Sequence, residues 1–235
     1  MDNKMEETDI LQILRQFAIY RSSLSKEHED FVRKQIQKEY EFVTKTYELQ
    51  GRVYKGTYRT DSKRCENIEA YKKESKLATV LASFGFDVIL IEENNSIPGK
   101  KPDAIVNGVV MDFKEIEALD EQSIGKNTFG KNYQEAMRKE NSAGVAMYIH
   151  NFSENFVYKN MIKKTSPTRN GMALFFHEDT GNLQLIDMEN VRASHYRKIQ
   201  IITSSVSSEK HIKDITSIID KRSSVKKRMK NDIER

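Results

Sequence analysis

The sequence is poor in cysteine, in paired histidines and in long apolar runs, and each shortage excludes a class of protein. Its one cysteine, Cys65, excludes an intramolecular disulfide and a Cys₄ zinc site, and it is typical of a reducing compartment. The five histidines are scattered without paired spacing, which disfavours a zinc cluster. No apolar run approaches the length of a membrane span, and Met1 to Glu7 is acidic and polar, unlike a signal peptide. We therefore expect a soluble, cytoplasmic protein without a membrane partner.

A glycine-rich nucleotide loop is also missing, because Lys126 and Lys131 do not lie in a Walker pattern, and this disfavours an ATPase. The chain has 235 residues, of which 37% are hydrophobic and 31% charged. This length and composition predict one domain with appendages, a modest core and long charged helices.

Residues 100–114 read as one β-hairpin that carries two carboxylates and a lysine. Asn107-Gly108 is a strong hairpin signal, because both turn positions favour positive φ. Asp103 then opens one strand, while Asp112 and Lys114 share one face of its partner because side chains alternate along a strand. An ordinary amphipathic edge strand would give the same pattern.

The preceding segment predicts a helix that directs a carboxylate toward this hairpin. Apolar residues recur at helical spacing over 68–84, and Glu74 falls on the same face as Leu77 and Leu81. A carboxylate facing a sheet needs a positive partner, for which a metal ion or Lys114 is suitable. Gly85 ends the helix, and residues 86–91 form a buried strand.

This order of elements resembles the PD-(D/E)xK nuclease superfamily, with Glu74 in the first helix, then Pro102-Asp103 and Asp112-Phe113-Lys114. More narrowly, it is similar to the C-terminal nuclease domains of CdiA-type contact-dependent inhibition toxins. That similarity lies in Tyr71–Glu74, Gly85–Val88, Lys101–Ala104, Asn107-Gly108 and Asp112–Lys114. The resemblance covers roughly Cys65 to Thr203, and it departs from the commoner pattern in having Asp rather than Glu at position 112.

The resemblance implies hydrolysis of phosphodiester bonds in DNA or RNA with Mg²⁺ or Mn²⁺. It implies that Asp103, Asp112 and Glu74 bind the metal and that Lys114 orients or deprotonates a water molecule. Gln134 would face the site from the next helix. A toxin of this kind also implies an inhibitor, or immunity, protein as a partner.

Two alternatives stay open. Similar runs occur in metal-independent ribonucleases, in which Lys114 would act with Asn127, Thr128, Lys131 or Asn132 on a ribose 2′-hydroxyl. The other is a catalytically silent nucleic-acid-binding or interaction protein that keeps the hairpin as a scaffold. For nucleic-acid binding we expect the polar, basic loop with Lys126, Asn127, Thr128 and Lys131, together with the C-terminal residues Lys226, Lys227 and Arg228.

The predicted fold is α/β, a central mixed β-sheet flanked by helices, with the restriction-endonuclease-like core that the resemblance implies. We expect an N-terminal helical region at 1–50, with helices at 9–20 and 25–49, and a nuclease-like core at 51–205. A basic helical tail follows at 206–235. Strands are predicted near residues 86, 103, 109, 144, 172, 183 and 198, with another over 52–59 and helices at 133–139 and 151–164.

Overall fold

The computed structural model describes residues 6–37, 41–49, 52–60, 68–91, 101–119, 121, 123–125, 127–164, 171–188 and 202–204. Its helices are α1 (Glu6–Ser22), α2 (Lys26–Ile36), α3 (Ile68–Ser83), α4 (Thr128–Ala136) and α5 (Glu154–Lys164). Its strands are β1 (Glu41–Leu49), β2 (Arg52–Thr60), β3 (Asp87–Leu90), β4 (Ala104–Val106), β5 (Val109–Ile116), β6 (Gly144–Ile149), β7 (Met172–His177), β8 (Asn182–Asp187) and β9 (Ile202–Ser204).

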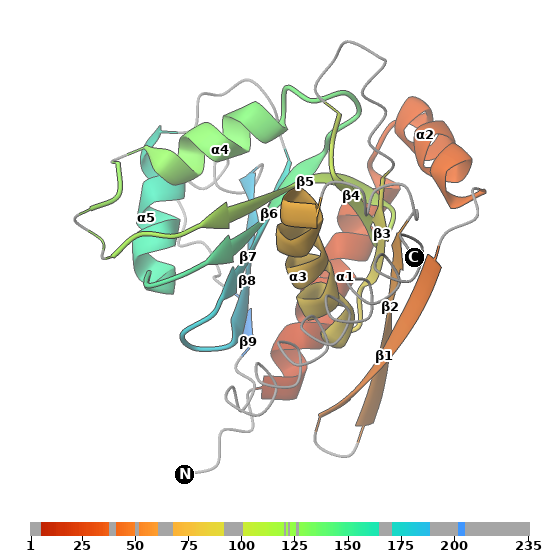
Figure 1. Ribbon diagram of the computed structural model, residues 1–235, viewed down its shortest axis with the longest axis horizontal. Helices are drawn as coiled ribbons and strands as arrows, with labels where there is room; N and C mark the ends of the chain where they lie inside the picture. Colours follow the sequence, from red (N-terminus) through yellow and green to blue (C-terminus); the bar gives the residue numbers. More distant parts are fainter. Residues whose placement is uncertain are drawn as a thin grey trace, which may run out of the picture.

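The strands of the described residues form one nine-stranded mixed sheet whose spatial order follows the sequence (Figure 1). Strand β2 pairs in parallel with β3, and β5, β6 and β7 are parallel to one another, while the other neighbours are antiparallel. This is the α/β class that the sequence predicts, a mixed sheet with flanking helices and two helices at the N-terminus. No helix in the described ranges has the length and apolar content to cross a bilayer.

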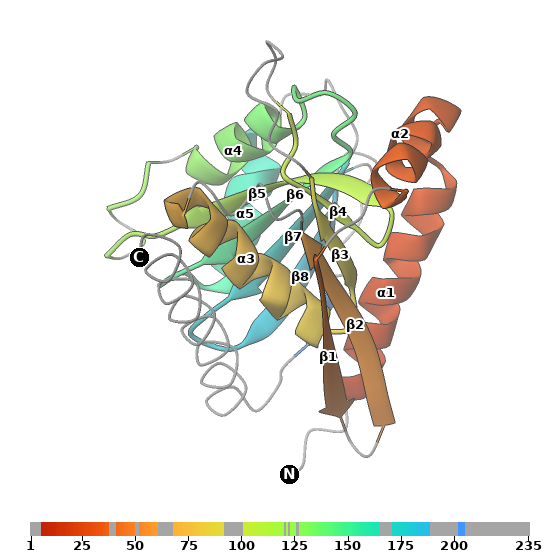
Figure 2. The same cartoon turned by 45° about the vertical axis from the view of Figure 1, so that its right-hand side comes forward.

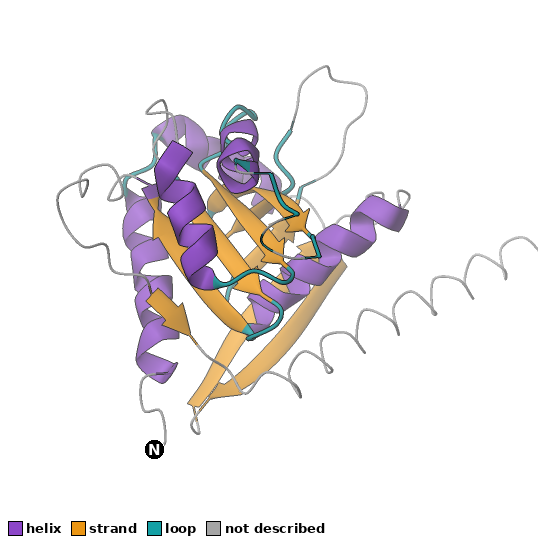
Figure 3. Cartoon of the chain, turned by 90° about the vertical axis from the view of Figure 1, so that its left-hand side faces the viewer, coloured by secondary structure: helices purple, strands orange, loops and turns teal. Residues whose placement is uncertain are grey.

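Helices cover the sheet on both sides (Figures 2 and 3). Helices α1 and α3 pack on one apolar cluster, through residues such as Phe17 and Leu81. Helices α4 and α5 pack on the opposite face, where Phe129 and Val157 belong to a second cluster. A small third cluster joins Val32 of α2 to β3, β4 and β5. Both N-terminal helices therefore pack on the sheet, through different apolar clusters.

Two local predictions at glycines are confirmed. Asn107 and Gly108 have φ values of 47° and 80°, so the β4–β5 connection is the expected turn with two positive φ angles. Gly85 has φ 91°, and the N–H of Phe86 donates to the carbonyl of Leu81 at 3.2 Å, which closes the end of α3. The cap at Gly85 fixes where α3 ends, and the turn at Asn107-Gly108 fixes where β5 begins.

Helix boundaries account for the errors. The helix predicted over 25–49 is wrong after Ile36, because residues 41–49 form β1, paired along its length with β2. Phe42, Val43 and Tyr47 suit a strand as well as a helix face, and the available partner strand decides between them. Helix α4 begins at Thr128 and ends at Ala136, earlier than the predicted 133–139. Helix α5 begins at Glu154 rather than at 151.

Candidate active site

The hairpin brings Asp103, Asp112 and Lys114 together. Asp103 directly precedes β4, and its Oδ2 accepts a hydrogen bond of 2.8 Å from the backbone N–H of Phe113. In β5, Asp112 lies on the same face as Val110, which packs beneath α2, and Ile116, which joins the α4–α5 cluster. Asp112 therefore lies on this face between the positions covered by α2 and those covered by α4 and α5.

Two ammonium groups lie beside these carboxyl groups. Lys114 Nζ lies 3.0 Å from Asp112 Oδ2. Lys139, three residues beyond α4, contacts Asp112 Oδ1 and lies 3.4 Å from Asp103 Oδ1. The side chain of Asp112 is 0% exposed, and Lys139 is 12% exposed. Lys139 therefore bridges the two aspartates, of which Asp112 is fully buried, while Asp103 and Lys114 remain partly exposed.

The paired carboxylates perturb each other. Burial, followed by the hydrogen bond and negative charge of Asp112, raises the pKa of Asp103 to about 8. Burial favours the neutral form of Asp112, but hydrogen bonds with Asp103 and Lys139 outweigh it and hold the pKa of Asp112 below its usual range. Burial likewise opposes the charge on Lys114, yet Asp112 raises the pKa of that amine. The site therefore favours one proton on Asp103 and an ionised Asp112.

Glu74 is half-buried on α3, and its charge contributes to the raised pKa of Asp103. It lies near enough to act on that carboxyl. Within the described ranges, however, no three His, Cys, Asp or Glu side chains are grouped closely enough to hold a metal ion. Glu74 therefore acts on Asp103 through its charge, and its part in metal binding stays a prediction.

The residues predicted on the following loop and helix lie on or next to α4. Gln134 is half-buried there, directly before Glu135, whose charge helps to raise the pKa of Lys114. Lys131 Nζ lies 4.0 Å from Glu135 Oε1 and its side chain is largely exposed. Exposed Asn127 precedes the helix, and the hydroxyl of Thr128 donates to the carbonyl of Gly125. The remaining predicted contacts, Lys126, Lys226, Lys227 and Arg228, fall outside the described residues.

A second polar cluster joins residues that no sequence motif groups together. Glu115, His150 and Glu178 come from the carboxyl ends of the neighbouring parallel strands β5, β6 and β7. The His150 ring lies between the two carboxylates, with Nε2 3.0 Å from Glu115 and Nδ1 against Glu178. Lys76 of α3 lies 3.4 Å from Glu115 Oε1 and over the Tyr148 ring. This network ties α3 to the carboxyl ends of the strands.

Sequence patterns do not reveal Lys139 or His150, because neither belongs to a motif or to an apolar period. Buried carboxylates on the Asp-x-Lys strand require a positively charged partner, but lysine is common in this sequence. Only the tertiary contacts show that Lys139 is that partner.

Comparisons with known proteins give one weak structural likeness. No protein-family model matches the sequence, and no curated protein matches it. A chain of the CdiA-CT/CdiI toxin and immunity complex from Burkholderia pseudomallei is similar in structure, with a TM-score of 0.37 and 19% sequence identity. The alignment covers 52% of this chain and 87% of that chain. At this score the likeness carries no weight for function.

Proposed function

We propose that this protein is a metal-dependent nuclease of the PD-(D/E)xK type that hydrolyses phosphodiester bonds in DNA or RNA. The observation that supports it is the meeting of Asp103, Asp112 and Lys114 on one hairpin, with Asp112 fully buried and two ammonium groups beside it. An isolated edge-strand carboxylate would be solvated and would need neither burial nor two cations. The site therefore places the carboxyl oxygens of two aspartates in direct contact with positive charge, as a cation-binding site requires.

The residues fit a hard divalent cation. Mg²⁺ is usually bound by one or two carboxylates and keeps several water molecules, so a third protein ligand is not required. Within the described residues, Asp112 Oδ2 accepts no hydrogen bond of good geometry, although Lys114 Nζ is close to it. Asp103 and Asp112 would hold Mg²⁺ or Mn²⁺ in place of the Lys139 ammonium. A bound ion would supply charge stabilisation at the phosphate and a more acidic water.

The protein's own groups would divide the remaining work. Lys114 stays protonated, as the raised pKa of its amine indicates, so it would stabilise negative charge on the phosphate or orient the attacking water rather than act as a base. Glu74 would add negative charge beside Asp103, as its contribution to the raised pKa of that carboxyl indicates, and would so strengthen the attraction for the ion. A nuclease acting on the nucleic acid of its own cell needs restraint, so an inhibitor protein belongs to the same proposal.

The decisive assay incubates the purified chain with transfer RNA, total RNA and plasmid DNA in Mg²⁺, Mn²⁺ or EDTA. Asp112→Asn should lower the cleavage rate by about 10² to 10³-fold, since loss of a metal-binding charge costs several kcal/mol in the transition state. Lys114→Met should be impaired as well. Asp179→Asn is the matched control, because this exposed side chain accepts a hydrogen bond from Asn151 that an amide can also accept.

The outcomes separate the candidate functions. EDTA-sensitive cleavage that depends on Asp112 supports the proposal. Cleavage of RNA that persists in EDTA and in Asp112→Asn would establish the metal-independent ribonuclease instead. Absence of cleavage under every condition, with the fold intact by circular dichroism, would leave a non-catalytic nucleic-acid-binding or interaction protein.

A further inference from the structure

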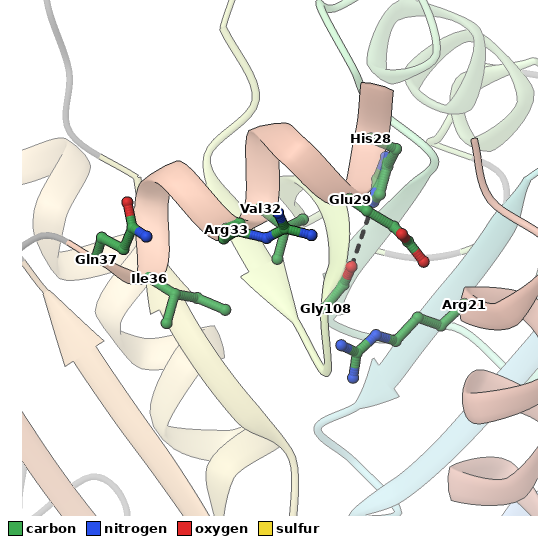
Figure 4. A pocket seen from close by; sticks show the side chains of 8 residues that line it. All are labelled: Arg21, His28, Glu29, Val32, Arg33, Ile36, Gln37 and Gly108. Atoms are coloured by element: carbon green, nitrogen blue, oxygen red, sulfur yellow. Dashed lines mark hydrogen bonds between the residues drawn. The ribbon is translucent and has the colours of Figure 1, made fainter. Parts of the chain in front are cut away.

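A pocket of about 310 Å³ lies where α2 meets the β4–β5 turn (Figure 4). Arg21 at the end of α1 and Arg33 of α2 bring two guanidinium groups to it, and Val32 and Ile36 line it with apolar surface. Figure 4 shows Arg21 beside Gly108, and a Cβ at Gly108 would lie 2.6 Å from Arg21 Nε. This volume lies near the lower end of the range of small-ligand sites.

His28 fixes this pocket relative to the candidate active site. Its Nδ1 lies 3.1 Å from the carbonyl oxygen of Asn141, and its Nε2 lies 3.3 Å from both the carbonyl oxygen of Gly108 and the backbone nitrogen of Val110. Asn141 follows Lys139 by two residues, and Val110 precedes Asp112 by two on the same face of β5. The buried histidine therefore locks α2 against both the strand and the loop that form the aspartate site.

The separation of the two sites suits an extended polymer. Asp112 follows Gly108 by four positions along β5, which is about 13 Å at 3.3 Å per residue. One strand of duplex DNA advances about 3.4 Å per nucleotide along the axis, so this distance equals roughly four nucleotides. A ligand that reaches both sites must have charged groups repeated along its length, as a nucleic acid does.

The chemistry of the pocket matches one nucleotide. Arginine forks bind phosphate oxygens in pairs, and the apolar side chains Val32 and Ile36 offer a surface for a sugar or base. Arg33 pairs with Asp30 at 3.6 Å, but both side chains are exposed and such pairs are weak, so a phosphate can take over the guanidinium. Glu29 also lines the pocket, and its negative charge weakens the attraction for a phosphate there.

We infer that the α2 pocket, formed around Arg21 and Arg33, binds a backbone phosphate of the nucleic-acid strand about four nucleotides from the bond cleaved at Asp103 and Asp112. This inference rests on the proposed function for the cleavage site. The binding step itself is independent of catalysis. The N-terminal helices α1 and α2 then bind the substrate in addition to packing on the sheet.

Binding should be measured by fluorescence anisotropy with a labelled 20-nucleotide single-stranded RNA and a labelled duplex DNA. The full chain carries Lys114→Met in every sample, so that cleavage does not interfere. Adding Arg21→Gln and Arg33→Gln should weaken binding at least tenfold and reduce the salt dependence by about one to two ions. Arg33→Gln alone, at an exposed position, should give part of this loss. Arg15→Gln, exposed on α1, should match the parent and serves as the control.

The results distinguish this inference from the proposed function. Arginine-dependent binding without cleavage by the wild-type chain would uphold the subsite and refute the nuclease. Cleavage by the wild-type chain with binding indifferent to both arginines would refute the subsite alone. If neither nucleic acid binds the Lys114→Met chain, the subsite is also refuted.

Discussion

Replacing Lys139 with methionine should tighten Mg²⁺ binding while it destabilises the metal-free protein. The Lys139 ammonium bridges Asp103 and Asp112, which is where the proposed ion would bind. The ion must displace this ammonium in the wild-type chain but not in Lys139→Met. Methionine keeps most of the aliphatic length, so the packing beyond α4 is retained.

The magnitudes follow from the contacts. Two unit charges about 4 Å apart interact by about 4 kcal/mol at an effective dielectric constant near 20, and a third of this value already changes affinity about tenfold. Without metal, loss of one partner of a buried pair costs about 3 to 5 kcal/mol. Here Lys114 still neutralises Asp112, and Asp103 takes up a proton readily because its pKa is raised to about 8. We therefore expect the free energy of unfolding of metal-free Lys139→Met to be about 2 kcal/mol lower than that of the wild type.

Isothermal titration calorimetry gives the Mg²⁺ affinity, and urea denaturation in EDTA and in saturating Mg²⁺ gives the free energy of unfolding. The ion should stabilise Lys139→Met more than the wild type, in proportion to its tighter binding. Lys159→Met, exposed on α5, is the matched control and should behave like the wild type. Equal stabilisation of Lys139→Met and the wild type by Mg²⁺ would show that the ammonium and the ion do not compete, and the reasoning would fail.

Two further predictions concern the proton on Asp103 and the packing of Gly56 against α3. Because the pKa of Asp103 is raised to about 8, the folded metal-free protein keeps a proton that the unfolded chain releases near pH 4, so stability should fall as pH rises between these values. Denaturation in EDTA at pH 5 and pH 8 should show this fall in the wild type and a smaller one in Asp103→Asn. Gly56→Ala should destabilise the fold by about 3 kcal/mol or more, since a Cβ there would overlap the backbone carbonyl of Ala82 in α3, whereas Gly125→Ala would meet only the Thr128 hydroxyl at 3.3 Å. A Gly56→Ala melting temperature equal to that of Gly125→Ala would contradict this packing argument.

Parts of the fold were readable because their causes lie within a few residues. The turn at Asn107-Gly108 and the end of α3 at Gly85 depend on backbone conformations that these residues adopt easily. Together with alternation along β5, the turn is enough to bring Asp112 and Lys114 to one face near Asp103. The helix predicted over 25–49 failed where the local pattern was ambiguous, because the pairing of β1 with β2 overrides a helical spacing.

The sequence by itself determined the hairpin, the two carboxylates and the lysine that the hairpin carries, and the cap of α3. These features depend on local dihedral preferences and side-chain alternation, which act over short separations. Only the tertiary structure decided that Lys139 bridges the aspartates and that His150 lies between two glutamates. It also decided that α2 presents Arg33 beside the hairpin turn. Those contacts join residues far apart in sequence, and they form only when burial of the whole sheet fixes which charges must neutralise each other.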